Sequence, residues 1–122
     1  MNIQVRKALI KRARRRTEQL ITYQQLSDEC SLGLNMAEQF DRNAIAEILD
    51  EISTFEHEHG RPLLSSLVVR ANDGHEGKGF YKLAERLGFG DRRLLEEGFF
   101  ATNQINECIA FWQNDTNFST HQ

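Results

Sequence analysis

One stretch of regularly spaced apolar residues, from residue 41 to residue 58, does most to determine what this chain can fold into. Asp41 is suited to cap a first helical turn, and Gly60 followed by Pro62 is typical of a helix end. Between them, apolar residues recur at intervals of three and four and therefore share one helical face. They are Ile45, Ile48, Leu49, Ile52 and Phe55. The pattern predicts a long helix with one buried face.

The next segment has the composition of a short strand and a hairpin. Leu63 to Val69 is rich in apolar and β-branched residues, which favours an extended strand. Asn72-Asp73-Gly74 then predicts a turn in which the glycine supplies a positive φ. A long helix followed by a strand and a glycine-containing hairpin is the second half of a winged helix, and we expect that fold.

The first forty residues supply the elements that precede the long helix of such a fold. Val5, Leu9 and Ala13 repeat about every four residues and predict a first helix with a narrow apolar stripe. The run Thr22–Gln25 fits a capping box at the start of a second helix that covers Tyr23 to Cys30. Residues 31–40 form a connector.

The remainder of the chain is expected to be helical. A short helix over residues 82–87 stops at Gly88, and a final helix runs from near Asp91 to about Gln113 with an interruption around Gly98. Its inward face consists of Ile105, Cys108, Ile109 and Trp112. The predicted architecture is a single α+β domain over residues 1–113, namely a winged helix-turn-helix with a small β-hairpin wing and additional C-terminal helices. Residues 114–122 are expected to be a frayed polar tail.

Positive charge is concentrated at the N-terminus. Residues 1–17 contain seven Lys or Arg residues and no acid, so this segment carries +7. Because the whole chain has a net charge of −3, the remaining residues carry −10. A basic helix is a candidate phosphate-binding surface, whereas an acidic body repels a polyanion.

Composition points to a soluble globular protein. The 122 residues suffice for one core, and 39% are hydrophobic and 27% charged. No apolar run approaches the roughly 20 residues that span a bilayer, and the basic N-terminus lacks the apolar stretch of a signal peptide. We therefore expect a cytoplasmic protein without membrane association. Cys30 and Cys108 lack neighbours at metal-ligand spacing and are expected to be reduced thiols, and no cofactor is expected.

Three segments resemble the DNA-binding half of the DNA-repair alkyltransferases and of the alkyltransferase-like proteins. Ile21–Leu26 is similar to that family's threonine-tyrosine-glycine-x-leucine entry, and Arg42–Ile45 is similar to the arginine-led start of its recognition helix. Leu64–Val69, followed by Asn72–Gly74, lies where the family has proline-cysteine-histidine-arginine-valine-valine and a glycine-bearing wing. The resemblance covers residues 20–81 and implies that Arg42 acts as a wedge or phosphate contact on DNA.

A second resemblance covers nearly the whole chain. Gly60–Val69, Gly77–Tyr81 and Phe111-Trp112 are similar to small uncharacterised bacterial proteins. This resemblance implies no activity.

The departures from the alkyltransferase pattern exclude alkyl transfer. Ser65 lies where the family has its alkyl-accepting cysteine, and Ser66 lies where it has a histidine. A serine hydroxyl with no adjacent base does not replace a thiolate nucleophile. The resemblance therefore implies a non-catalytic reader, as in the alkyltransferase-like proteins.

Other candidate sites are weaker. His57-Glu58-His59 looks like a metal site, but residues two apart on a helix diverge by about 200°, so a polar helix end is the preferred interpretation. Gly74–Gly79 lacks the glycine spacing of a phosphate-binding P-loop and indicates a flexible loop tip. The solvent face of the long helix is expected to repel the phosphates of nucleic acid, because it carries Glu47, Asp50 and Glu51, with Glu56 and Glu58 beyond them.

The sequence thus predicts a protein without enzymatic activity that binds nucleic acid through the first helix, the start of the long helix and the wing. The candidate contact residues are Lys11, Arg12, Arg14, Arg15, Arg16, Tyr23, Arg42, Asn43, Arg70 and Lys78. The alternative is a protein-interaction module, such as an immunity protein or antitoxin, whose acidic body covers a basic partner. The two interpretations differ in whether the basic first helix and the wing lie on one face.

Overall fold

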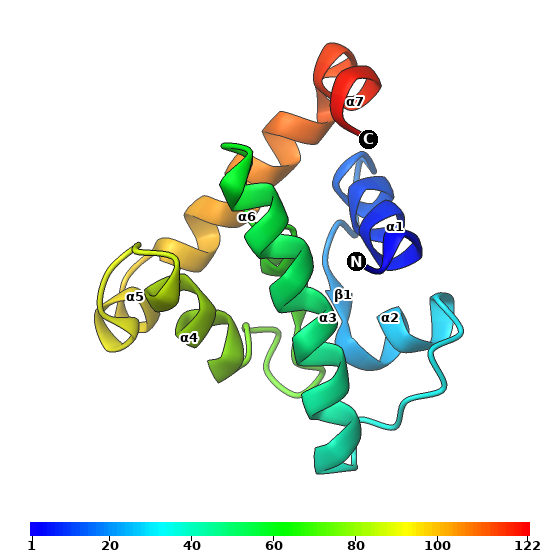
Figure 1. Ribbon diagram of the computed structural model, residues 1–122, viewed down its shortest axis with the longest axis vertical. Helices are drawn as coiled ribbons and strands as arrows, with labels where there is room; N and C mark the ends of the chain where they lie inside the picture. The colour runs from blue at the N-terminus through cyan, green and yellow to red at the C-terminus, as the bar shows by residue number, and fades with distance from the viewer.

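The computed structural model describes residues 1–122, the whole chain, and is mostly helical (Figure 1). The elements in chain order are α1 (Ile3–Ala13), β1 (Ile21–Thr22), α2 (Tyr23–Glu29), α3 (Gln39–Glu58), the 3-10 helix η1 (Leu64–Leu67), β2 (Val68–Val69), α4 (Lys78–Arg86), α5 (Arg92–Glu97), α6 (Phe100–Gln113) and α7 (Asp115–His121). Seven α-helices and a two-stranded parallel sheet give a mixed α+β structure. No helix is both long enough and apolar enough to cross a membrane.

The central helix α3 carries the apolar face that its sequence predicts. Ile45, Leu49 and Ile52 are buried, and Ile48 packs against them. Figure 1 shows α3 in the middle of the molecule, with α6 crossing it and α1 to one side. The short helix η1 packs against α1, α3 and α6. The main core therefore lies between α3 and helices from both ends of the chain, and it includes the predicted inward residues Cys108 and Trp112.

The two ends of α3 differ in how well local signals predict them. Gly60 has a φ of +72° and ends the helix in the left-handed conformation, as expected. The N-cap prediction is wrong, because the helix begins at Gln39 rather than after Asp41. The Asp41 carboxylate instead accepts a hydrogen bond from the Asn35 backbone N–H at 2.9 Å. This bond ties the connector to the first turn of the helix.

The predicted capping box is confirmed at the start of α2. The Gln25 N–H donates to Thr22 Oγ1 at 3.2 Å, and the Thr22 N–H donates to Gln25 Oε1 at 3.0 Å. The strand β1 directly before it pairs in parallel with β2, with Ile21 opposite Val68. The sheet therefore brings the start of α2 next to the segment that follows α3.

Only the last two residues of the predicted Leu63–Val69 strand form β2. The first part forms η1, since the whole segment is buried between helices and its backbone bonds locally or to side chains. The Ser66 N–H donates to the Leu63 carbonyl at 3.1 Å, and the Ser65 N–H donates to the buried Ser53 hydroxyl at 3.1 Å. These bonds satisfy a backbone that has no neighbouring strand.

The predicted β-hairpin wing does not form. A tight turn does occur at Asn72–Gly74, closed by a hydrogen bond from the last residue's N–H to the Arg70 carbonyl at 2.9 Å. No second strand follows, because the chain enters α4 directly after Gly77, whose N–H is bonded to the Tyr23 hydroxyl. The wing is replaced by a compact loop, residues 70–77.

The expected C-terminal tail is a helix, α7, and the prediction that it frays is wrong. Arg14 holds this helix in place. Its guanidinium donates to the Trp112 carbonyl at 2.8 Å and to the Asp115 carboxylate at 2.9 Å, and it lies 4.1 Å from the centre of the Phe118 ring. These contacts with the end of α1 offset the conformational entropy lost when the tail is ordered.

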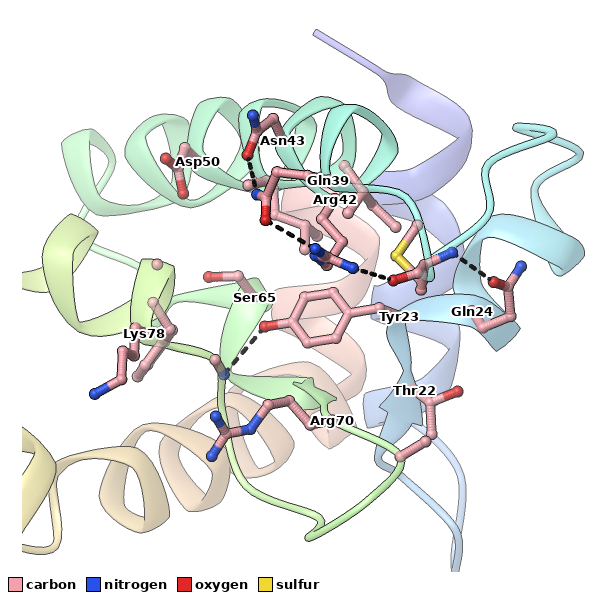
Figure 2. Close-up of a pocket in the computed structure, with 18 of the residues that line it drawn as sticks. Thr22, Tyr23, Gln24, Gln39, Arg42, Asn43, Asp50, Ser65, Arg70 and Lys78 are labelled. Atoms are coloured by element: carbon pink, nitrogen blue, oxygen red, sulfur yellow. Dashed lines mark hydrogen bonds between the residues drawn. The ribbon is translucent and has the colours of Figure 1, made fainter.

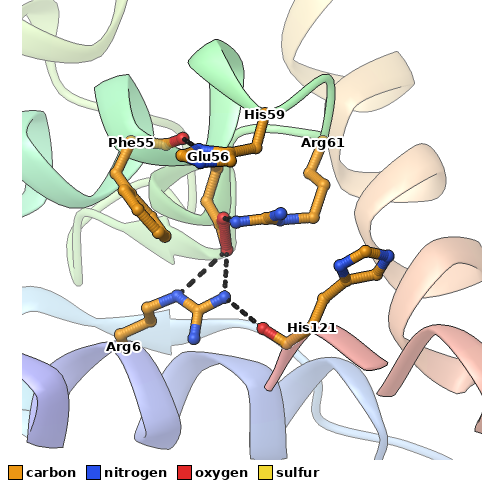
Figure 3. Close-up of polar contacts among 6 residues, drawn as sticks. All are labelled: Arg6, Phe55, Glu56, His59, Arg61 and His121. Carbon is orange, nitrogen blue, oxygen red and sulfur yellow. Dashed lines mark hydrogen bonds and ion pairs between the residues drawn. The ribbon is translucent and has the colours of Figure 1, made fainter. Parts of the chain in front are cut away.

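A buried ion-pair cluster joins both ends of the chain to α3 (Figure 3). Glu56 is fully buried, so the prediction that it lies on the solvent face is wrong. Its Oε1 accepts from Arg6 Nε at 3.2 Å and Nη2 at 3.0 Å, and its Oε2 accepts from Arg61 Nε at 2.8 Å. Arg6 Nη2 also donates to the His121 carbonyl of α7 at 2.7 Å. Arg6 therefore belongs to the interior rather than to a basic surface.

Candidate functional site

A cleft of about 810 Å³ opens between the first half of α3, the start of α2 and the loop that leads into α4 (Figure 2). We call it the cationic cleft. Its only acidic lining residue is Asp50, and its cationic lining residues are Arg42, Arg70, Lys78 and Lys82. The ionised side chains of the lining therefore sum to +3, in a chain whose net charge is −3.

Tyr23 lies inside the cleft because it is the first residue of α2, directly after the capping threonine. Its hydroxyl accepts a hydrogen bond from the Gly77 N–H at 3.2 Å and donates none to another protein group. Burial raises the pKa of Tyr23, which keeps the hydroxyl protonated and able to donate. A Cβ at residue 77 would lie 3.0 Å from this hydroxyl, so a larger residue there would push the hydroxyl back by a few tenths of an ångström.

Arg42 lies near the start of α3, and neutral oxygens hold its guanidinium. It donates to the Met36 carbonyl at 2.7 Å and to the Gln39 side chain at 2.8 Å. Gln39 in turn donates to Asn43 Oδ1 at 2.8 Å, which leaves the Asn43 amide N–H groups without a protein acceptor. This wall of the cleft therefore presents a positive charge and uncharged hydrogen-bond donors.

The opposite wall is formed by α4 and the loop before it. Lys78 and Lys82 lie one helical turn apart, and neither takes part in an ion pair. Arg70 pairs with Asp73 within the loop at 2.7 Å. Together with Arg42, three of the four cations thus have no protein counter-charge, which leaves them available to an anionic ligand.

Asp50 lies in the cleft rather than on the expected solvent face of α3. It accepts a hydrogen bond from Arg86 of α4 at 3.2 Å. Burial raises the pKa of Asp50, and the bond to Arg86 partly offsets this effect. The acidic solvent face is correctly predicted for Glu47 and Glu51, which are exposed. The sequence does not reveal that α4 packs beside Asp50.

The structure brings together half of the predicted contact residues. Those that line the cationic cleft are Tyr23, Arg42, Asn43, Arg70 and Lys78. No residue from the first helix lines it. The predicted nucleic-acid surface is thus divided, and the cleft contains the part contributed by α2, α3 and the loop.

The predicted contacts of the first helix lie elsewhere. A smaller groove along α1 is lined by Lys11, Arg12 and Arg15. Arg12 pairs there with Glu29 at 2.7 Å. Arg14 anchors α7 as described above, and Arg16 lines neither concave surface.

Sequence reasoning missed Gln39 and Lys82 as cleft residues. Lys82 follows Lys78 by four residues, so helical spacing alone indicates that both lie on one face. Gln39 is missed because the N-cap signal at Asp41 places the helix start too late.

Ser65 lines the cleft where the alkyltransferase resemblance places a nucleophile, but its hydroxyl is engaged. Ser53 Oγ donates to Ser65 Oγ at 2.6 Å and accepts from the Ser65 N–H at 3.1 Å. No histidine or carboxylate is hydrogen-bonded to either hydroxyl, so no base is positioned to activate Ser65. No group of three or more His, Cys, Asp or Glu side chains is placed to hold a metal ion.

The arrangement suits an anionic ligand that also offers hydrogen-bond acceptors. Cations come from α3, α4 and the loop between β2 and α4, and Tyr23 and Asn43 add uncharged donors. No protein-family model matches this chain, and no curated protein or solved structure is significantly similar to it.

Proposed function

We propose that this protein is a non-catalytic nucleic-acid-binding protein and that the cationic cleft is its binding surface. The observation that carries the proposal is the convergence of four cations on one concave surface of an otherwise acidic body. Phosphate neutralisation by Lys and Arg supplies most of the affinity of such proteins. Arg42, Lys78 and Lys82 have no carboxylate partner, so an entering phosphate displaces no internal ion pair.

The proposal includes a relationship to winged helices, with α2 and α3 as the helix-turn-helix. The element order α1, β1, α2, α3, β2 supports this relationship. The meeting of Tyr23, Arg42 and Ser65 in one cleft also supports it, because these residues belong to the segments that resemble the alkyltransferase-like proteins. In this view the compact loop, residues 70–77, takes the place of the wing.

The first helix has a secondary role in this proposal. Arg6 and Arg14 are engaged in ion pairs within the fold. Lys11, Arg15 and Arg16 are exposed and form no ion pair. They add attraction at long range, which salt screens beyond about 8 Å at physiological ionic strength.

Fluorescence anisotropy with labelled oligonucleotides over a salt series tests the proposal. Affinity should fall steeply between about 50 and 200 mM salt. The variants Arg42→Ala, Lys78→Ala and Lys82→Ala should each lower the slope of log K against log salt by about 0.7–0.9, the value for one phosphate contact. Arg93→Ala, which removes an exposed, unpaired cation of α5, is the matched control. Binding that does not depend on salt refutes the proposal. So does a slope of log K against log salt that is the same for the wild type, the cleft variants and the control.

A protein-interaction module is the second candidate, because one side of α3 is acidic. Glu47, Glu51 and Glu58 are exposed there, although Glu51 already pairs with the Met1 amino group at 2.9 Å. Such a surface attracts a basic partner, as in an immunity protein or antitoxin. A pull-down from the host with and without nuclease separates the candidates, since a basic protein that stays bound after nuclease treatment supports this alternative.

A further inference from the structure

Arg70 differs from the other cations of the cationic cleft because it already has a carboxylate partner. It lies on the same wall of the cleft as Lys78 (Figure 2). Its Nη2 donates to Asp73 Oδ2 at 2.7 Å, and its Nε donates to Asp73 Oδ1 at 3.3 Å. A guanidinium also binds a phosphate with a pair of parallel N–H groups of this kind. Asp73 therefore occupies donors that would otherwise suit a phosphate in the cleft.

The turn that carries Asp73 holds its carboxylate in position. Asp73 Oδ1 also accepts a hydrogen bond from the His75 N–H at 3.0 Å. The turn is closed by the Gly74 N–H, which donates to the Arg70 carbonyl at 2.9 Å, and by the Arg70 N–H, which donates to the His75 carbonyl at 2.8 Å. The bond from His75, aided by Arg70, lowers the pKa of Asp73, so the carboxylate stays ionised at neutral pH. The loop thus supplies Arg70 with a fixed counter-charge.

The paired carboxylate lies outside the cleft, although its partner lines it. Arg70 and Asn72 are lining residues, whereas Asp73 is not. A phosphate inside the cleft and Asp73 outside it would therefore compete for one guanidinium. While paired, Arg70 adds no net charge to the field that attracts a polyanion. The Arg70 and Asp73 side chains are 40% and 36% exposed, so water screens the pair and little free energy is needed to break it.

We propose, resting on the function proposed above, that Asp73 is an internal competitor that holds Arg70 back from the phosphates of a nucleic acid in the cleft. The phosphate contacts of the wild-type protein are then made by Arg42, Lys78 and Lys82. Arg70 is a latent contact, and it becomes the fourth one when the charge of Asp73 is removed.

The test uses the intact protein and a labelled oligonucleotide over the salt series described above. Asp73→Asn removes the charge but keeps an oxygen that can accept from the His75 N–H, so the turn should be retained. Glu29→Gln is the matched control, because it also removes one negative charge from an arginine, namely Arg12 in the smaller groove outside the cleft. The Glu29 side chain is 45% exposed, so this pair is screened in a similar way. Circular dichroism checks that both variants fold.

Asp73→Asn should raise the affinity by about 2- to 5-fold at about 50 mM salt, since an exposed ion pair opposes binding by no more than this. It should also steepen the slope of log K against log salt by about 0.7–0.9, the value for one phosphate contact. Glu29→Gln should leave this slope nearly unchanged. Arg70→Ala should hardly change the slope of the wild-type protein but should lower that of the Asp73→Asn protein by about 0.7–0.9. This double-mutant cycle shows whether the gain depends on Arg70.

The contrary outcomes separate this inference from the proposed function. Asp73 is not a competitor if Asp73→Asn behaves like Glu29→Gln, or if the gain persists without Arg70. The same conclusion follows if Arg70→Ala alone lowers the slope as much as Arg42→Ala does. In each of these cases, salt-dependent binding that Arg42→Ala weakens still supports the proposed function. If the wild-type protein binds no oligonucleotide in a salt-dependent way, the proposed function fails and this inference fails with it.

Discussion

Replacing Glu56 with Gln removes the negative charge that two buried arginines share. The substitution keeps the shape of the side chain and one oxygen that can accept a hydrogen bond. Arg6 and Arg61 then remain in the interior with no counter-charge, each on one side of the amide. Because Arg6 also bonds to the His121 carbonyl, the loss should affect α1, α3 and α7 together.

The magnitude follows from the burial of all three side chains. Glu56 has no exposed side-chain surface, and the Arg6 and Arg61 side chains are each 7% exposed. Removing one partner of a buried ion pair costs about 3–5 kcal/mol, because the other charge stays desolvated. Two charges are left here, so we expect the upper part of that range, about 4–5 kcal/mol. This is a large share of the about 5–15 kcal/mol that keeps a domain folded.

Urea denaturation followed by circular dichroism measures this free energy of unfolding. The midpoint should fall by more than about 1 M, given a denaturant slope of about 1–3 kcal/mol per M. Glu51→Gln is the control, since this carboxylate of the same helix is 62% exposed and pairs with the Met1 amino group. It should cost less than about 1 kcal/mol. An equally small cost for Glu56→Gln would refute the reasoning from burial.

Two further predictions concern the titration of buried groups. Glu76 is buried, its Oε1 has no hydrogen-bond partner, and burial raises its pKa above the ordinary 4.5. The folded protein then holds this proton to a higher pH than the unfolded chain does, so stability falls as the pH rises from about 4 through the raised pKa. Glu76→Gln should therefore raise the melting temperature at about pH 7 but not below about pH 4, and thermal melts that show no such pH-dependent difference would contradict this. Burial also raises the pKa of the Cys30 and Cys108 thiols. A thiol-specific reagent at about pH 8 should label neither thiol until urea unfolds the protein, whereas rapid labelling of the native state would show that they are accessible.

Local signals predict the elements whose ends are determined by nearby residues. The apolar stripe of α3, the left-handed Gly60, the capping box at Thr22 and the break at Gly98 are all confirmed. In each case the physical cause lies within a few residues of the element.

Predictions fail where the cause is tertiary. The segment Leu63–Val69 is apolar enough for a strand, but α1, α3 and α6 pack against its first part, and Ser53 bonds to its backbone. Residues 115–121 are polar enough to fray, but Arg14 holds them. Neither packing partner is close in sequence, so neither outcome follows from local composition.

The candidate site shows the same division. Arg42, Arg70 and Lys78 are recognisable as cations at turns and helix ends, and they do line the cleft. The charge cluster of the first helix is the most prominent feature of the sequence, yet the fold uses Arg6 in the core and Arg14 against α7. Counting charges along a sequence does not show which of them internal carboxylates and carbonyls already engage.

Two charge-matched triple variants test most directly whether the cationic cleft is the nucleic-acid-binding surface. One replaces Arg42, Lys78 and Lys82 with Ala. The other, the first-helix variant, replaces three exposed residues with Ala, namely Lys11 of α1 and Arg15 and Arg16 just after its end. Each removes three positive charges, so both have the same net charge. The cleft variant should lower the slope of log K against log salt for a labelled oligonucleotide by about 2, and the first-helix variant should leave it nearly unchanged. Equal slopes for the two variants, or the larger loss in the first-helix variant, would contradict the assignment of binding to the cleft.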